Sequence, residues 1–281
     1  MRILITGGRG MLARSILTHL AGNELFPVDF QEADITDAKA VDALFDQIRP
    51  AVAIHCAAMT QVDDCETFKD KAFQVNAEGT GNVATACRRH GARLIAISTD
   101  YVFSGDSPRP YRESDPAEGA RTVYGQSKRA GELQALEKCP GALVCRLGWL
   151  YGPGGPSFVH TMLRLADGTR PVLKVVADQR GNPTSALAVA EHLGILLEQP
   201  SISGILHLTC EGEASWCDFA REIFRQARRG QAVEPCTTDQ FPRPAPRPRN
   251  SRLEKARLRE LGLPPMPDWH DALAQFLAAG L

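Results

Sequence analysis

The first residues of the chain carry the feature that most constrains its fold. A short apolar run, residues 3–5, leads directly into Thr-Gly-Gly-Arg-Gly, and the apolar spacing of a helix follows. Glycines let the backbone turn sharply, and a phosphate can then approach the free N–H groups at the start of the helix. Ala13 allows that helix to pack closely. The segment predicts a dinucleotide-binding turn, with contacts from Gly7, Arg9, Gly10, Met11 and Leu12.

Short apolar runs alternate with longer helical patterns through the first half of the chain. The runs lie at residues 3–6, 25–28, 52–56, 93–97 and 142–147, and helical patterns lie between them, one of them at residues 72–90. Such strands, bounded by turn residues, are typical of a parallel sheet covered by helices on both faces. We therefore expect an α/β fold in which residues 1–151 form a Rossmann-type, doubly wound, dinucleotide-binding domain.

The alternation weakens after residue 152, where the sequence becomes Gly-Pro-Gly-Gly-Pro. Helical patterns are expected at residues 158–166, 216–227 and 252–281, and apolar runs at 172–176 and 205–208. A Pro-Arg-rich stretch covers residues 241–249. We expect residues 152–281 to form mainly a smaller C-terminal substrate-binding lobe, with some segments returning to the Rossmann sheet.

Composition narrows the class of partner. The chain has 281 residues, 43% of them hydrophobic, with 32 Lys and Arg against 33 Asp and Glu. This balance favours neither nucleic acid nor a membrane surface, and we expect neither partner. The Arg-rich region at 243–259 is interpreted as a pyrophosphate contact or a solvated face. The apolar run at the N-terminus is too short for a signal peptide, so we expect a cytoplasmic protein.

The eight cysteines are scattered, without a Cys-x-x-Cys pair or zinc spacing. We interpret them as reduced structural thiols and name no metal site.

Two residues give opposing signals about the cofactor. Asp29 lies about twenty residues beyond the glycine turn, where a carboxylate can bind an adenosine ribose and repel a 2′-phosphate. Arg9 could instead pair with that phosphate. Both NADPH and NADH therefore stay open.

Further cofactor contacts are expected after the second and third strands. Asp34 and Ile35 are expected near the adenine. The small residues Ala57 and Ala58, followed by Met59, end the third strand where the cofactor must pass close to the backbone.

Tyr124 and Lys128 form the candidate catalytic pair. Residues four apart on a helix share a face, so the ammonium can lie beside the phenol and lower its pKa toward neutrality. Ser98, Thr99 and Asp100 follow the fourth strand, at the edge of the sheet where ligands bind in such folds. This arrangement points to proton-coupled hydride transfer.

These motifs resemble the extended short-chain dehydrogenase/reductase family. The shared motifs are the N-terminal glycine turn, the Asn-Ala-Glu-Gly-Thr segment at 76–80, a Ser/Thr after the fourth strand, and Tyr-x-x-x-Lys. Within it, residues 98–103, 146–152, 178–184 and 249–253 resemble the dTDP-4-dehydrorhamnose reductases. The chain departs from that pattern at Ala13, at Gly148 in a segment that often reads Thr-Ser-Trp, and at Glu254.

The resemblance implies a mechanism and a site. Tyr124 would protonate the C4 ketone oxygen of a nucleotide-linked deoxysugar while NADPH or NADH delivers hydride, converting dTDP-4-dehydro-L-rhamnose to dTDP-L-rhamnose. Lys128 would lower the Tyr124 pKa and bind the nicotinamide ribose, and Thr99 would hold the carbonyl. Asp100, Tyr101 and Trp149 would shape the sugar pocket.

Three alternatives stay open from the sequence. The chain could be another extended-family reductase or an epimerase of a different sugar nucleotide. It could also be a dinucleotide-binding regulatory subunit resembling the β-subunit of methionine adenosyltransferase. The sequence leaves the oligomeric state open, with a homodimer as one candidate.

Overall fold

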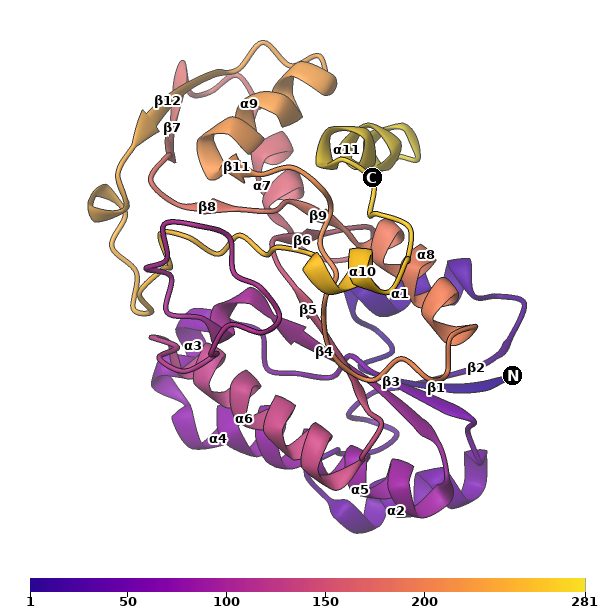
Figure 1. Cartoon of the computed structure of the whole chain (residues 1–281). Helices are drawn as coiled ribbons and strands as arrows, with labels where there is room; N and C mark the ends of the chain where they lie inside the picture. The colour runs from indigo at the N-terminus through magenta and orange to yellow at the C-terminus, as the bar shows by residue number, and fades with distance from the viewer. Residues whose placement is uncertain (281) are drawn as a thin grey trace.

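A parallel sheet forms the centre of the computed structural model, which describes residues 1–280 (Figure 1). Its strand order is β10-β5-β4-β3-β1-β2, and every neighbouring pair is parallel. The order reverses direction beside β1, as in doubly wound folds. The predicted Rossmann-type sheet is confirmed, with strands β1 Arg2–Thr6, β2 Glu24–Val28, β3 Val52–His55, β4 Arg93–Thr99, β5 Leu143–Leu147 and β10 Gly204–His207.

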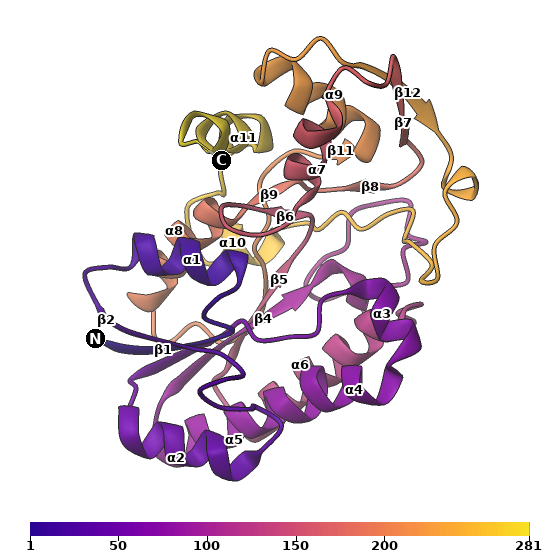
Figure 2. The same ribbon diagram turned by 180° about the vertical axis from the view of Figure 1, so that it is seen from behind.

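Helices cover both faces of this sheet (Figures 1 and 2). On one face lie α2 Ala38–Ile48, α5 Thr80–His90 and α6 Val123–Lys138, and on the other lie α1 Met11–His19 and α8 Ala186–Leu197. Alternate residues of β1 serve both layers, because Ile3 and Ile5 join the α1/α8 core while Leu4 joins the α2/α5 core. This explains why the strands are apolar throughout rather than alternating.

The helix expected at residues 72–90 is divided into segments. After α3 Val62–Thr67, the chain forms α4 Lys69–Phe73, a π-helical segment η1 Gln74–Gly79, and then α5. The segment passes very close to α6, since a Cβ at Gly131 would lie 2.2 Å from the Asn76 carbonyl oxygen. π-Helical turns are often found beside functional sites, and this one borders the large cavity described below.

The second half of the chain builds a layer beyond the carboxyl ends of the strands (Figure 1). The expected strand at 205–208 does return to the main sheet, as β10. The region 252–281 was expected to be helical, but residues 261–268, which include three prolines, separate two short helices there. The remaining elements are η2 Asp100–Val102, β6 Leu150–Tyr151, α7 Phe158–Leu165, β7 Val172–Val176, β8 Arg180–Gly181, β9 Thr184–Ser185, β11 Ala214–Ser215, α9 Trp216–Gln226, β12 Ala232–Cys236, η3 Thr238–Gln240, α10 Ala256–Glu260 and α11 Trp269–Ala278.

None of the helices within residues 1–280 combines the length and the apolar character needed to cross a membrane.

Candidate active site

A cavity of about 970 Å³ opens at the carboxyl edge of the sheet. It lies between α6 and the glycine turn after β1, residues 6–10, which we call the phosphate loop. A volume of this size suits a large ligand. Many residues predicted from the sequence line it together: Gly7, Gly10, Met11, Leu12, Asp29, Asp34, Ile35, Ala57, Ala58, Thr99, Asp100, Tyr101, Tyr124 and Trp149. Arg9, Met59 and Lys128 are not among the residues that line the cavity.

The glycine turn between β1 and α1 has the geometry of an anion site. Gly7 has a positive φ of 67°, and a Cβ there would lie 2.8 Å from the Ala57 nitrogen, so only glycine fits without strain. Gly10 is the N-cap of α1 and offers no side chain to the first turn, which also lacks acidic residues. The free N–H groups of the helix therefore remain available to a phosphate.

Asp29 holds the phosphate loop in place. Its Oδ2 accepts a hydrogen bond from the Arg9 backbone nitrogen at 3.0 Å, and its Oδ1 accepts one from the Phe30 nitrogen at 2.8 Å. The Arg9 guanidinium turns toward Gln31 at 2.6 Å and Glu32 at 2.8 Å. The two residues that gave opposing signals are thus neighbours in space, in the loops that follow β1 and β2.

Asn76 connects the loop after β3 to α6. Its Oδ1 accepts from the Met59 nitrogen at 2.8 Å, and its Nδ2 donates to the Met59 oxygen at 3.1 Å and to Ser127 Oγ at 3.0 Å. Met59 and Tyr124 both pack against the small buried cluster of Cys65, Ala72 and Val123, and Met59 does not line the cavity. Asp34 Oδ1 accepts a hydrogen bond from the Thr36 backbone nitrogen at 2.9 Å, as in an Asx turn, and a second one from the Thr36 hydroxyl at 2.8 Å.

The end of β4 meets successive turns of α6. Thr99 and Tyr124 line the cavity together, and Lys128 Nζ donates to the Ile97 carbonyl at 2.8 Å. Ser98, between them on the strand, donates to Glu132 at 2.6 Å. The expected grouping of hydroxyl, phenol and ammonium is therefore present at this edge.

Burial dominates the electrostatics of this group. It raises the pKa of Tyr124 well above the ordinary value, and the Thr99 side chain only partly opposes this rise. This direction is opposite to the lowered pKa expected from the sequence, because burial of the phenol has the largest effect on it. Burial also lowers the pKa of Lys128 to about 8, with Glu132 opposing it. Near neutrality the phenol keeps its proton and can donate it.

Asp100 lies fully inside the protein, beside Thr99. Its Oδ1 accepts from Thr99 Oγ1 at 3.0 Å, while its Oδ2 has no hydrogen-bond partner among the described residues. Burial raises the pKa of Asp100 to about 6. A Cβ at Gly148 would lie 2.9 Å from Oδ2, so the glycine that departs from the family pattern leaves room for this carboxyl.

Two aromatic residues shape the outer part of the cavity. Tyr101 lies edge-on to Tyr124, with ring centroids 5.7 Å apart. Trp149 adopts a positive φ of 48°, which is uncommon for a bulky residue and is often associated with ligand sites. Its indole nitrogen donates to Ser251 Oγ at 3.1 Å.

Sequence reasoning missed several lining residues. Phe30, Thr60, Lys71, Gln74 and Pro156 all line the cavity. Lys71 and Gln74 are three residues apart and share a helical face, but that spacing is too common to single them out. Pro156 belongs to the Gly-Pro-rich segment whose position only the fold reveals.

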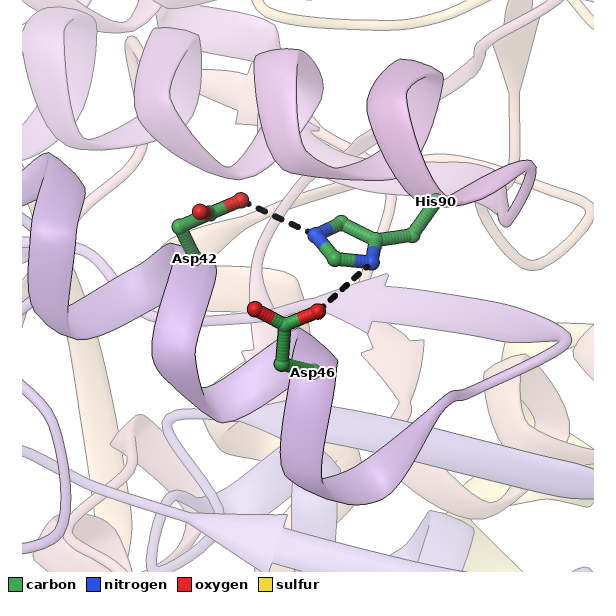
Figure 3. A group of neighbouring side chains, drawn as sticks. All are labelled: Asp42, Asp46 and His90. Atoms are coloured by element: carbon green, nitrogen blue, oxygen red, sulfur yellow. Dashed lines mark hydrogen bonds and ion pairs between the residues drawn. The ribbon is translucent and has the colours of Figure 1, made fainter.

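An acidic group with one histidine lies apart from the cavity, between α2 and α5 (Figure 3). His90 Nε2 lies 2.9 Å from Asp42, and Nδ1 lies 3.7 Å from Asp46. Arg89 also pairs with Asp42 at 2.6 Å. The arrangement fits ion pairing between two helices, and none of these side chains lines the cavity.

Comparison with known proteins agrees with this geometry. The family model described as RmlD substrate binding domain matches residues 1–281. A dTDP-4-dehydrorhamnose reductase of Streptomyces griseus is 43% identical over 99% of this chain and 93% of its own length. A probable dTDP-4,6-dihydroxy-2-methyloxan-3-one 4-ketoreductase of Streptomyces antibioticus is also 43% identical, over 98% and 94%.

A solved structure is similar along its whole length. The dTDP-4-dehydrorhamnose reductase of Bacillus anthracis, solved in complex with NADP, superposes with a TM-score of 0.95 at 38% identity and covers 99% of both chains. Fold and site together define an extended short-chain dehydrogenase/reductase. Within that class, the chain belongs to the RmlD substrate binding domain family.

Proposed function

We propose that this protein reduces the C4 ketone of a nucleotide-linked deoxysugar with NADPH or NADH, converting dTDP-4-dehydro-L-rhamnose to dTDP-L-rhamnose. The observation that carries the proposal is the convergence of Thr99, Tyr124 and the phosphate loop on one cavity. Lys128 follows Tyr124 by four residues on α6 and contacts the Ile97 carbonyl at the end of β4. The names of the relatives at about 40% identity support the substrate class.

The residues have distinct roles in this reaction. The reduced nicotinamide supplies a hydride to C4 when it is bound. Thr99 hydrogen-bonds the ketone oxygen and holds it beside the phenol, and Tyr124 transfers its proton to that oxygen. Lys128 stabilises the phenolate left behind and binds the nicotinamide ribose.

The cofactor site fits a dinucleotide of either kind. We assign the pyrophosphate to the α1 N-terminus, through Gly7, Gly10, Met11 and Leu12. We assign the adenosine to the loops after β1 and β2, through Arg9, Asp29, Asp34 and Ile35. Ala57 and Ala58 leave room for the nicotinamide half of the cofactor. Met59 packs against the same buried cluster as Tyr124. NADPH and NADH are both accepted in this proposal.

We assign the sugar pocket to Asp100, Tyr101 and Trp149, and the nucleotide to the lobe formed mainly by residues 152–281. The stack of Trp149 on Trp216, which belongs to that lobe, supports this assignment. A homodimer and a cytoplasmic location stay predictions.

The test is NADPH oxidation with dTDP-4-dehydro-L-rhamnose, comparing the wild type with Tyr124→Phe. Loss of the proton donor should reduce kcat by about 10²- to 10⁴-fold. Tyr151→Phe is the matched control, because its buried hydroxyl has no hydrogen-bond partner in the part of the chain described here. A folded wild type without turnover would reject the proposal.

A second substrate is favoured by one observation. The relative from Streptomyces antibioticus is named for a different dTDP-linked 4-keto sugar, at the same 43% identity. A panel of dTDP-4-keto sugars distinguishes this substrate from dTDP-4-dehydro-L-rhamnose through the ratio of their kcat/KM values.

A further inference from the structure

A buried ion pair lies one helical turn beyond Lys128 and plays no part in the steps described above. Glu132 on α6 is 2% exposed, and Arg146 on β5 is 1% exposed. The guanidinium donates to the carboxylate through Nε at 2.7 Å and Nη2 at 2.8 Å. Ser98 donates to the same carboxylate at 2.6 Å, and Arg129 on α6 donates to it at 3.0 Å through Nη1. A bidentate pair with this support has a fixed position.

Glu132 is four residues after Lys128, so the two side chains share a helical face. They also line one small cavity, together with Thr80 and Ser98. Its volume of about 10 Å³ is near the minimum for one water molecule. Bulk solvent therefore does not separate the two charges, and their interaction is stronger than a surface pair of the same spacing.

We propose that Glu132 is a positioning residue of the reductase, whose carboxylate keeps Lys128 charged and seated against the Ile97 carbonyl, while Arg146 limits this effect. The inference rests on the proposed function. In this proposal Glu132 and Arg146, which do not touch the reacting atoms, set the charge and position of the Lys128 ammonium. That ammonium stabilises the Tyr124 phenolate. Burial lowers the pKa of Lys128 to about 8, and Glu132 opposes this.

Other groups around Lys128 do not supply this charge. From the β3 side, burial lowers the pKa of His55 to about 3 and raises that of Cys56 to about 12, so both are neutral near neutrality. Asp100 follows β4 and lines the large cavity, but it does not line the small cavity that holds Lys128 and Glu132. The helices η1 and α5 present the Asn76 amide and the Thr80 hydroxyl. Glu132 is the carboxylate whose charge raises the Lys128 pKa.

The two members of the pair should act in opposite directions. Glu132→Gln removes an anion, lowers the pKa of Lys128, and moves the loss of activity at high pH to lower pH. Arg146→Gln removes a cation that always remains protonated, so Lys128 should lose its proton at higher pH. A purely structural role would weaken the enzyme in both variants without opposite shifts.

The experiment measures kcat against pH with NADPH and dTDP-4-dehydro-L-rhamnose, and the titration of ¹³C-labelled lysine side chains by NMR. The Lys128 signal is assigned with Lys128→Arg. In Glu132→Gln, both the alkaline limb and the lysine titration should move down by about one pH unit or more. In Arg146→Gln both should move up. Folded variants with unmoved titrations, or with shifts of the same sign, would overturn the proposal.

Two further variants complete the test. Asp42→Asn makes the same carboxylate-to-amide change in the distant ion pair of Figure 3 and should leave the pH profile unchanged. The double variant E132Q/R146Q removes both charges, so its lysine titration should return toward the wild type. If one single variant does not fold, the Lys128 titration of the other is compared with that of the double variant. The same titration in both proteins would contradict the proposal. The NMR titration needs no turnover, so failure of the proposed function is recognised separately.

Discussion

The indole rings of Trp149 and Trp216 lie face to face, with centroids 3.5 Å apart and planes 1° from parallel. Trp149 follows β5 of the main sheet and lines the cavity, whereas Trp216 begins α9 in the C-terminal layer. The Trp216 indole nitrogen donates to Gln179 Oε1 at 3.1 Å, which fixes its ring. The stack therefore connects the cavity wall to α9 of the C-terminal layer.

Trp216→Leu should weaken binding of the sugar nucleotide without changing cofactor binding. An aromatic pair contributes about 0.5–1.5 kcal/mol beyond its buried area, which corresponds to roughly a two- to tenfold rise in KM. Steady-state KM values for the sugar nucleotide and for NADPH check this. Phe224→Leu alters a buried aromatic on the same helix and should change neither KM. Equal changes in both KM values for Trp216→Leu would contradict the assignment.

Arg9→Ala should reduce kcat/KM for NADPH by about tenfold and leave the value for NADH nearly unchanged, because a guanidinium pairs well with a 2′-phosphate. Glu32→Gln should act oppositely, since Glu32 now pairs with Arg9 at 2.8 Å and competes for it. The ratio of kcat/KM for the two cofactors is the measurement. Arg121→Ala, in an exposed pair with Asp106, is the control. Equal losses for both cofactors would show that Arg9 does not read the phosphate.

Features with a local signal could be predicted from the sequence. The glycine turn, the apolar strands and the helical spacing of Tyr124 and Lys128 each depend on neighbouring residues, and the structure places them as expected. The strand β10 was also predicted, because residues 205–208 keep the apolar pattern of the first half. These features could be predicted because backbone propensity and burial pattern depend on residues that are close in the sequence.

Contacts between distant segments could not be predicted in the same way. The stack of Trp149 on Trp216 joins residues far apart in sequence, and no spacing rule brings them together. The position of Lys128 against the Ile97 carbonyl depends on how α6 lies across β4. The segment η1 likewise lies where Gly131 approaches Asn76 closely, and neither stretch of sequence signals this contact alone.

Asp100→Asn should stabilise the protein at high pH but not at low pH. Burial raises the pKa of Asp100 from 3.8 to about 6, so the folded state binds this proton more tightly than the unfolded state. Stability from the protonated carboxyl is complete below pH 3.8 and is lost as the pH rises through about 6. The full difference corresponds to about 3 kcal/mol.

Asparagine removes this cost, because its amide oxygen can still accept from Thr99 and it carries no charge at any pH. Urea unfolding should show a gain of about 1–3 kcal/mol at pH 8 that shrinks several-fold by pH 4. Asp106→Asn, at an exposed position, should show no such gain. A gain that is equal at both pH values would mean that the Asp100 charge is not the cause. If Asp100 also contacts the sugar, the stabilised variant should have a raised KM for the sugar nucleotide, because function and stability then place opposite demands on this buried carboxyl.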